Sequence, residues 1–197
     1  MKKKLASISL ILITVLAVFS AISLVFATPS TEVSGRWQSA NPPPGGLVTF
    51  NVKTAGANAF LTMHSYANYF VGDILGTPSP NIEQTICITF HYGDPEYVKT
   101  LPTGAVTITQ LREWNPTEWT WNIERKFTGT VLGIPGGFTM KLEAKGYGRL
   151  GYTDLVLEGT WVIIHGTDGL ENLHGQGTWH SVTVQLNEYN GQVHFDP

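Results

Sequence analysis

Residues 163–178 read I-I-H-G-T-D-G-L-E-N-L-H-G-Q-G-T, and this stretch predicts a β-hairpin. One strand ends at His165, and a second strand is entered through Gly175 and Gly177. The dipeptide Asp168-Gly169 between them is typical of a turn because both residue types tolerate positive φ, and we expect Gly169 to adopt it. The stretch contains no catalytic signature, so it indicates a fold and not an activity.

The first 27 residues predict an export signal. A basic segment, Lys2–Lys4, precedes an apolar run from Leu5 to Phe26, and Val25-Phe26-Ala27 has the small or apolar residues of a cleavage site. The run is also long enough to cross a bilayer uncleaved. We therefore expect a secreted or extracellular protein in which residues 1–27 are a signal peptide, or alternatively an N-terminal membrane anchor through residues 5–26. Residues 28–197 are enough for a single domain with its own core.

Charge and cysteine content limit the partners of the chain. The formal net charge is −3 with no basic cluster, which argues against binding to nucleic acid and leaves an uncleaved N-terminus as the predicted membrane contact. Cys87 is the single cysteine, so no internal disulfide can form. It lies in the strand-like run T-I-C-I-T-F, where we expect a buried small side chain. Oligomeric state does not follow from the sequence.

Local composition predicts an all-β domain. Glycine and proline punctuate runs that are rich in Thr, Val, Ile and aromatic residues, and helical periodicity is almost absent. Many strands at regular spacing favour an antiparallel sandwich or barrel. The predicted strands are Glu32–Ser39, Leu47–Thr54, Ala59–Val71, Glu83–Tyr92, Ala105–Trp114, Trp119–Val131, Gly137–Lys145, Leu155–His165, Gln176–Leu186 and Gly191–Phe195.

One motif occurs twice. Residues 70–78 and 127–135 share the pattern F-x-G-x-[I/V]-L-G-x-P. We expect Phe70 and Phe127 to pack inward, the glycines to allow a bend or the close approach of a neighbouring strand, and Gly-x-Pro to end the strand. Duplication and convergent barrel-corner chemistry both explain the match.

The named catalytic and cofactor-binding motifs are missing from the sequence, including zinc-protease, nucleophile-elbow, phosphate-loop and calcium-loop patterns. Four histidines fall late in the chain, and His165 and His174 are predicted to lie close together across the hairpin. A third metal ligand is not evident, because His180 would lie too far along the strand. We therefore predict no catalytic residue, no cofactor and no metal site.

The aromatic segment 119–127 is the best candidate for a pocket wall. Strand alternation places Trp119, Trp121, Ile123, Arg125 and Phe127 on one face, which we interpret as the inner face. If Phe70 also points inward, the same parity places His64, Tyr66 and Asn68 inside. Such an interior contains either a structural hydrogen-bonded network or a ligand. The predicted ligand-binding residues are His64, Tyr66, Asn68, Trp119, Trp121 and Arg125.

Two segments carry a family resemblance. F-T-G-T-V-L-G-I-P-G-G-F at 127–138 and L-E-G-T-W-V-I-I-H-G-T-D-G-L-E-N-L-H-G-Q-G-T-W at 157–179 resemble uncharacterised proteins with the allene oxide cyclase-like barrel fold. The wider superfamily includes plant dirigent proteins. The resemblance implies, for residues 28–197, a single antiparallel β-barrel of about eight strands with a central cavity. Asp168 departs from the G-T-G turn of that pattern. The matching residues specify barrel turns, so they support the fold more than any activity.

Three classes of function remain open. The first, which we favour, is an exported barrel that binds a small apolar or amphipathic molecule without catalysis. The second is an enzyme of the cyclase or dirigent kind, which would steer ring closure or coupling by shape and orientation. The third is an extracellular interaction module that presents an exposed aromatic surface. The volume and lining of the barrel interior would distinguish them.

Overall fold

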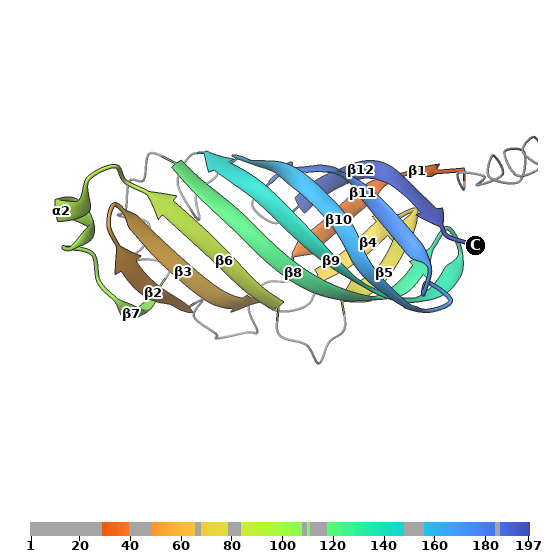
Figure 1. The fold of residues 1–197 in the computed structure, drawn as a ribbon, viewed down its shortest axis with the longest axis horizontal. Coiled ribbons are helices and arrows are strands. Elements are labelled where there is room, and N and C mark those ends of the chain that lie inside the picture. Colours follow the sequence, from red (N-terminus) through yellow and green to blue (C-terminus); the bar gives the residue numbers. More distant parts are fainter. Residues whose placement is uncertain are drawn as a thin grey trace, which may run out of the picture.

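The computed structural model describes residues 29–39, 49–65, 68–78, 84–107, 110, 118–147, 156–183 and 186–197, and these are almost entirely strand (Figure 1). The predicted all-β class is confirmed. The elements are β1 (Thr31–Ser39), β2 (Thr49–Ala55), β3 (Asn58–Ser65), β4 (Asn68–Gly72), β5 (Ile74–Pro78), β6 (Gln84–His91), α2 (Pro95–Val98), β7 (Gly104–Thr107), β8 (Glu118–Val131), β9 (Ile134–Tyr147), β10 (Val156–Asp168), β11 (Leu173–Ser181) and β12 (Leu186–Phe195).

Eight antiparallel strands close into a barrel, as predicted. Their order is β5–β4–β1–β12–β11–β10–β9–β8, and β5 pairs with β8 to complete the ring. The same sheet continues from β8 through β6, β3, β2 and β7. In Figure 1 this extension and α2 occupy one end of the molecule, while the closed barrel forms the other.

The length of β8 allows it to serve both parts of the sheet. Its first half pairs with β6 from Glu118 to Glu124, and its second half pairs with β5 from Phe127 to Val131. Arg125 lies between these two stretches, at the point where β8 changes its partner. The barrel and the extension therefore share one strand and one continuous inner face.

Strand alternation in β8 follows the prediction. Trp119, Ile123, Arg125 and Phe127 are buried, while the even-numbered residues that alternate with them point to the other face and are exposed or half-buried. Trp121 has the same parity and packs against the core, but it is only partly buried. A residue period of two along a half-buried strand accounts for this pattern.

The two F-x-G motifs meet each other in space. The rings of Phe70 and Phe127 lie 5.4 Å apart in an edge-on arrangement, and both are buried, as expected. Gly76 of the first motif faces Gly129 of the second across the β5–β8 pairing. Gly-x-Pro ends a strand only in the first motif, at Pro78, because in the second motif Pro135 lies near the start of β9. The repeat therefore forms the seam that closes the barrel.

The predicted strand Ala59–Val71 is not one strand, and this is a correction. It divides into β3, which pairs with β2 and β6, and β4, which pairs with β1 and β5. The division breaks the parity argument that linked residue 64 to Phe70. In β3 the buried residues are Ala59 and Leu61, at odd positions, whereas Phe70 in β4 is at an even position.

The decisive hairpin forms, but its strained residue differs from the prediction. Asp168 has φ +56°, and Gly169 is not among the residues with positive φ. Gly169 is instead required for space, because a Cβ there would lie 2.4 Å from the carbonyl oxygen of Pro135. The turn therefore packs directly against the start of β9.

Cys87 is exposed, which corrects the expectation of a buried thiol. Its neighbours Ile86 and Ile88 are buried, so the alternation of β6 turns Cys87 to the outer face.

Tyr189 ties three strands together at one corner of the barrel. Its hydroxyl oxygen accepts a hydrogen bond from the Ile74 amide at 3.0 Å, and the hydroxyl lies 3.3 Å from the carbonyl oxygen of Val71. A Cβ on Gly35 would lie 2.6 Å from this oxygen, so glycine is needed at that position. Burial is the main reason why the pKa of Tyr189 is raised to about 12.

Tyr189→Phe tests this corner. Because the substitution leaves the Ile74 amide without its acceptor, we expect the free energy of unfolding at pH 7 to fall by about 1–3 kcal/mol. A tyrosine titrates near pH 10 when unfolded and near 12 here, so its contribution is complete below pH 10 and is lost as the pH rises toward 12. Urea unfolding between pH 8 and 12 should show a steeper loss of stability for the wild type than for the variant. Parallel curves would contradict the assignment.

Gly129→Ala tests the seam. A Cβ at this position would lie 2.3 Å from the Leu75 carbonyl oxygen and 2.8 Å from the Gly76 Cα, so β5 and β8 would have to separate. We expect a loss of about 2 kcal/mol in thermal or urea unfolding. Lys126→Ala, on the exposed face of the same strand, is the control and should change stability by less than about 0.5 kcal/mol. Equal effects of the two substitutions would mean that the close approach is not needed.

Candidate functional site

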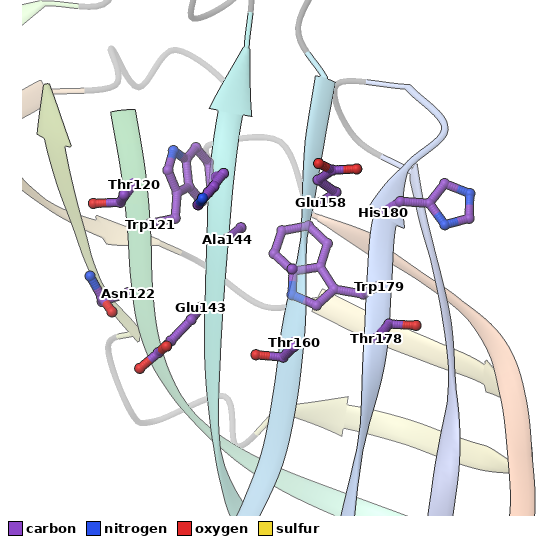
Figure 2. Close-up of a pocket in the computed structure, with 12 residues that line it drawn as sticks. Thr120, Trp121, Asn122, Glu143, Ala144, Glu158, Thr160, Thr178, Trp179 and His180 are labelled. Carbon is purple, nitrogen blue, oxygen red and sulfur yellow. The ribbon is translucent and has the colours of Figure 1, made fainter. Parts of the chain in front are cut away.

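A groove of about 770 Å³ crosses four neighbouring strands of the barrel wall, β8 to β11. Figure 2 shows its side chains in strand order, with Trp121 on β8 and Trp179 on β11 on either side of Ala144. Each strand contributes three consecutive residues to the lining. The lining residues are Thr120, Trp121, Asn122, Glu143, Ala144, Lys145, Glu158, Gly159, Thr160, Thr178, Trp179 and His180.

The groove is centred on one row of the sheet. Trp121 faces Ala144, Ala144 faces Gly159, and Gly159 faces Trp179 in the strand register. The two tryptophans are therefore separated by the two smallest residue types. Gly159 allows β10 to approach β9 closely at this row, because a Cβ there would lie 1.8 Å from the carbonyl oxygen of Glu143.

Two rows of polar residues flank this central row and, because successive side chains of a strand alternate, point to the outer face of the wall. One row contains Lys145, Glu158 and His180 in register, and the other contains Asn122 and Glu143. His180 also lies 3.5 Å from Glu188, which forms a 2.6 Å ion pair with Arg36. The flanking charges are mixed in sign, so they favour a neutral or dipolar partner over a strongly charged one.

Three indole N–H groups in this region have no hydrogen-bond partner. The Nε1 atoms of Trp119, Trp121 and Trp179 are buried and unpartnered within the described part of the chain. By contrast, Trp161 donates its Nε1–H to the carbonyl oxygen of Asn190 at 3.1 Å. Buried indole N–H groups normally find an acceptor, so these three donors are candidates for contact with a bound molecule.

Arg125 lies deeper in the barrel, among aromatic rings. Its guanidinium carbon is 5.5 Å from the ring centre of Trp37 and 5.6 Å from that of Phe70, distances at which a cation is attracted to an aromatic face. Burial lowers the pKa of Arg125 to about 9, so the side chain remains protonated at neutral pH. The interior therefore holds a positive charge in an aromatic setting, with only 3 % of the residue exposed.

The structure brings together some of the sequence-predicted site residues. The rings of Trp119 and Trp121 lie 5.8 Å apart, and Trp121 lines the groove, whereas Trp119 is 2 % exposed and belongs to the core. His64 belongs to β3 and Asn68 to β4, but their side chains lie outside the described part, as does Tyr66 altogether.

Sequence reasoning missed the opposite wall of the site. Trp179 contributes a ring on β11 that lies 5.1 Å from Trp37, and Ala144 and Gly159 lie between Trp179 and Trp121 in the lining. The G-T-W motifs at 159–161 and 177–179 were visible in the sequence. Only the strand register, however, places residue 179 in the row of Trp121.

The late histidines have register partners on both sides of the β10–β11 hairpin, and the proximity of His165 to His174 stays a prediction. His174 faces His194 across β11 and β12 with ring centres 5.4 Å apart, and His165 faces Thr139 of β9. The Nε2 atom of His174 lies 3.1 Å from the carboxylate of Asp196. Within the described ranges, no group of three or more metal-ligating side chains is arranged to hold a metal ion. Among the same residues, no helix has the length and apolarity needed to cross a bilayer.

Comparison with known proteins yields a structural likeness but no family. No family model matches the chain, and no curated protein matches it in sequence. The chain is similar to a crystal structure of a protein of unknown function from the DUF3224 family of Shewanella oneidensis MR-1. The identity is 15 % and the TM-score is 0.49, over 86 % of this chain and 99 % of that one. A likeness at this level does not assign a function.

Proposed function

We propose that the protein is an exported β-barrel that binds a small amphipathic molecule beside Trp121 without chemical conversion. The single observation that carries this proposal is the set of three buried indole N–H groups without acceptors around the groove. A ligand with an apolar body and a hydrogen-bond acceptor would pair with an indole N–H for which the described residues offer no acceptor.

The position of Trp121 supports binding on the inner side of the wall. Its side chain has inward parity and contacts the ring of Trp119, yet it is the only residue of this face between 119 and 127 that is not buried. Ala144, which faces Trp121 on β9, has a small side chain. The apolar body of a ligand would rest against Trp121, and its acceptor would point toward the indole N–H of Trp121 or Trp179.

The resemblance to allene oxide cyclase-like barrels is consistent with a ligand held inside the barrel, and it stays a prediction. Arg125 would act at a distance, because its charge makes the interior more favourable for the electronegative end of a ligand. His64, Tyr66 and Asn68 remain candidates for further contacts.

Binding is tested with 8-anilinonaphthalene-1-sulfonate, which has aromatic rings and a sulfonate acceptor. Trp121→Phe and Trp179→Phe each keep an apolar ring but remove the N–H donor. Since one hydrogen bond contributes about 1 kcal/mol, we expect each substitution to raise the Kd of the dye about fivefold. Trp161→Phe is the matched control because that indole already has a partner, and its Kd should equal that of the wild type.

Two results would contradict the binding proposal. One is an equal Kd for the wild type and all three variants. The other is dye binding that appears only when near-ultraviolet circular dichroism shows loss of tertiary packing, since loosened cores also bind this dye.

Export is tested separately by the location and N-terminus of the mature chain. Expressed in a secreting host, the protein should leave the cytoplasm and begin at Thr28, since cleavage is predicted after Ala27. A full-length chain in the membrane fraction would show that the N-terminal run is an uncleaved membrane anchor and not a signal peptide. Retention of a soluble full-length chain in the cytoplasm would exclude both.

A further inference from the structure

The turn between β8 and β9 has a residue that its backbone does not favour. Leu132 and Gly133 both have positive φ, at +51° and +82°. Two-residue hairpin turns of this kind select Asn, Asp or Gly, because a bulky side chain is crowded in the left-handed conformation. Leu132 occupies this position although 39 % of it is exposed. Local conformational preference therefore does not explain why leucine occupies this position. A contact between its side chain and a partner outside the barrel would explain it.

Neighbouring residues extend the apolar surface. Ile134, on the other side of the turn, is 39 % exposed, and Leu75 on the adjacent β5 is 53 % exposed. The backbone amide of Leu132 donates to the carbonyl oxygen of Asp73 at 2.9 Å, which fixes this turn against the β4–β5 turn. We name Leu75, Leu132 and Ile134 the apolar tip. It is a rigid projection, because Val131 beneath it is fully buried.

The apolar tip lies at the end of the barrel where the N-terminal segment joins it. Thr31, the first residue of β1, faces Val193 close to the end of β12, and Gly136 of β9 faces Asp168 at the neighbouring turn. In Figure 1, the start of β1 and the C-terminus lie at the same end of the barrel. The apolar run of the sequence stops at Phe26, so only a few residues separate a segment of membrane-spanning length from this end.

We propose that the apolar tip rests in the interfacial layer of a lipid bilayer and orients the barrel on the membrane surface. The partner is a zwitterionic bilayer, because the charged groups facing this end are mostly acidic: Asp73, Asp168, Glu171 and Asp196, with His174 and His194 beside the last of these. An anionic surface would repel them. An uncleaved N-terminal run would hold this end of the barrel beside the bilayer, and after cleavage the apolar tip would have to bind lipid by itself.

This orientation also sets the position of the groove. Along β8, Trp121 is ten residues before Val131, which corresponds to about 33 Å at the usual strand rise. The groove would therefore face the aqueous side while the apolar tip contacts lipid. The membrane contact is independent of the ligand-binding proposal, because the two surfaces share no residue.

The contact is tested with the full chain made by cell-free synthesis in the presence of phosphatidylcholine vesicles. Cys87→Ser removes the native thiol, and Ile134→Cys introduces a site for an environment-sensitive fluorophore. We expect its emission to shift to the blue and to be quenched by lipids that carry a nitroxide near the headgroup. The same label at Tyr97→Cys on α2, at the opposite end, should respond only to an aqueous quencher such as iodide.

Leu132→Asn separates the contact from folding. Asparagine suits the left-handed turn, so the melting temperature should be kept or raised, while nitroxide quenching at residue 134 should fall severalfold. The proposal would be overturned if iodide quenched the fluorophore at position 134 to the same extent as the fluorophore at position 97. A blue shift that needs no lipid and grows with protein concentration would show that a second copy covers the apolar tip, and would also overturn it.

Discussion

Closure of the barrel depends on the close approach of β5 and β8 at Gly76 and Gly129. Neither position can carry a Cβ without striking backbone of the opposite strand, at 2.5 Å from Thr128 and 2.3 Å from Leu75. The space that the glycines leave is occupied by neighbouring aromatic rings, because a Cβ on Gly129 would also lie 2.6 Å from the ring of Phe127. Backbone proximity and ring packing are thus two results of one sequence motif, used twice.

The interior combines a filled aromatic core with a region that is incompletely satisfied. Around Arg125, the rings of Trp37 and Phe70 supply favourable cation–π contacts that offset part of the cost of burying a charge. Around Trp121, the indole N–H groups lack that compensation. A packed core does not normally leave polar donors unpaired, which is why the tryptophans beside the groove are the candidate site.

The two ends of the barrel present different surfaces. The groove contains mixed charges and tryptophan, while the apolar tip contains exposed aliphatic side chains on a strained turn. The unpartnered indole N–H groups lie near the start of β8, and the strained turn follows the end of β8. A stiff, closed sheet keeps them apart at a fixed distance, so a membrane contact at one end need not block access at the other.

Much of the fold could be predicted from the sequence, because the signals are local. Alternation in residues 119–127 identified the inner face of β8, and the Asp168-Gly169 turn identified the β10–β11 hairpin. The failures arose where local signals were ambiguous. Residues 59–71 have continuous strand composition, yet the chain changes sheet partners between Ser65 and Asn68, which no periodicity of one segment can reveal.

The sequence by itself determined the strand class, the turn chemistry and which side chains of β8 face inward. Tertiary structure alone decided that Trp179 shares a row with Trp121, that His174 faces His194, and that Cys87 is exposed. The reason is physical. Side-chain direction along a strand follows from backbone geometry between adjacent residues, whereas the register between strands depends on contacts between residues far apart in the chain.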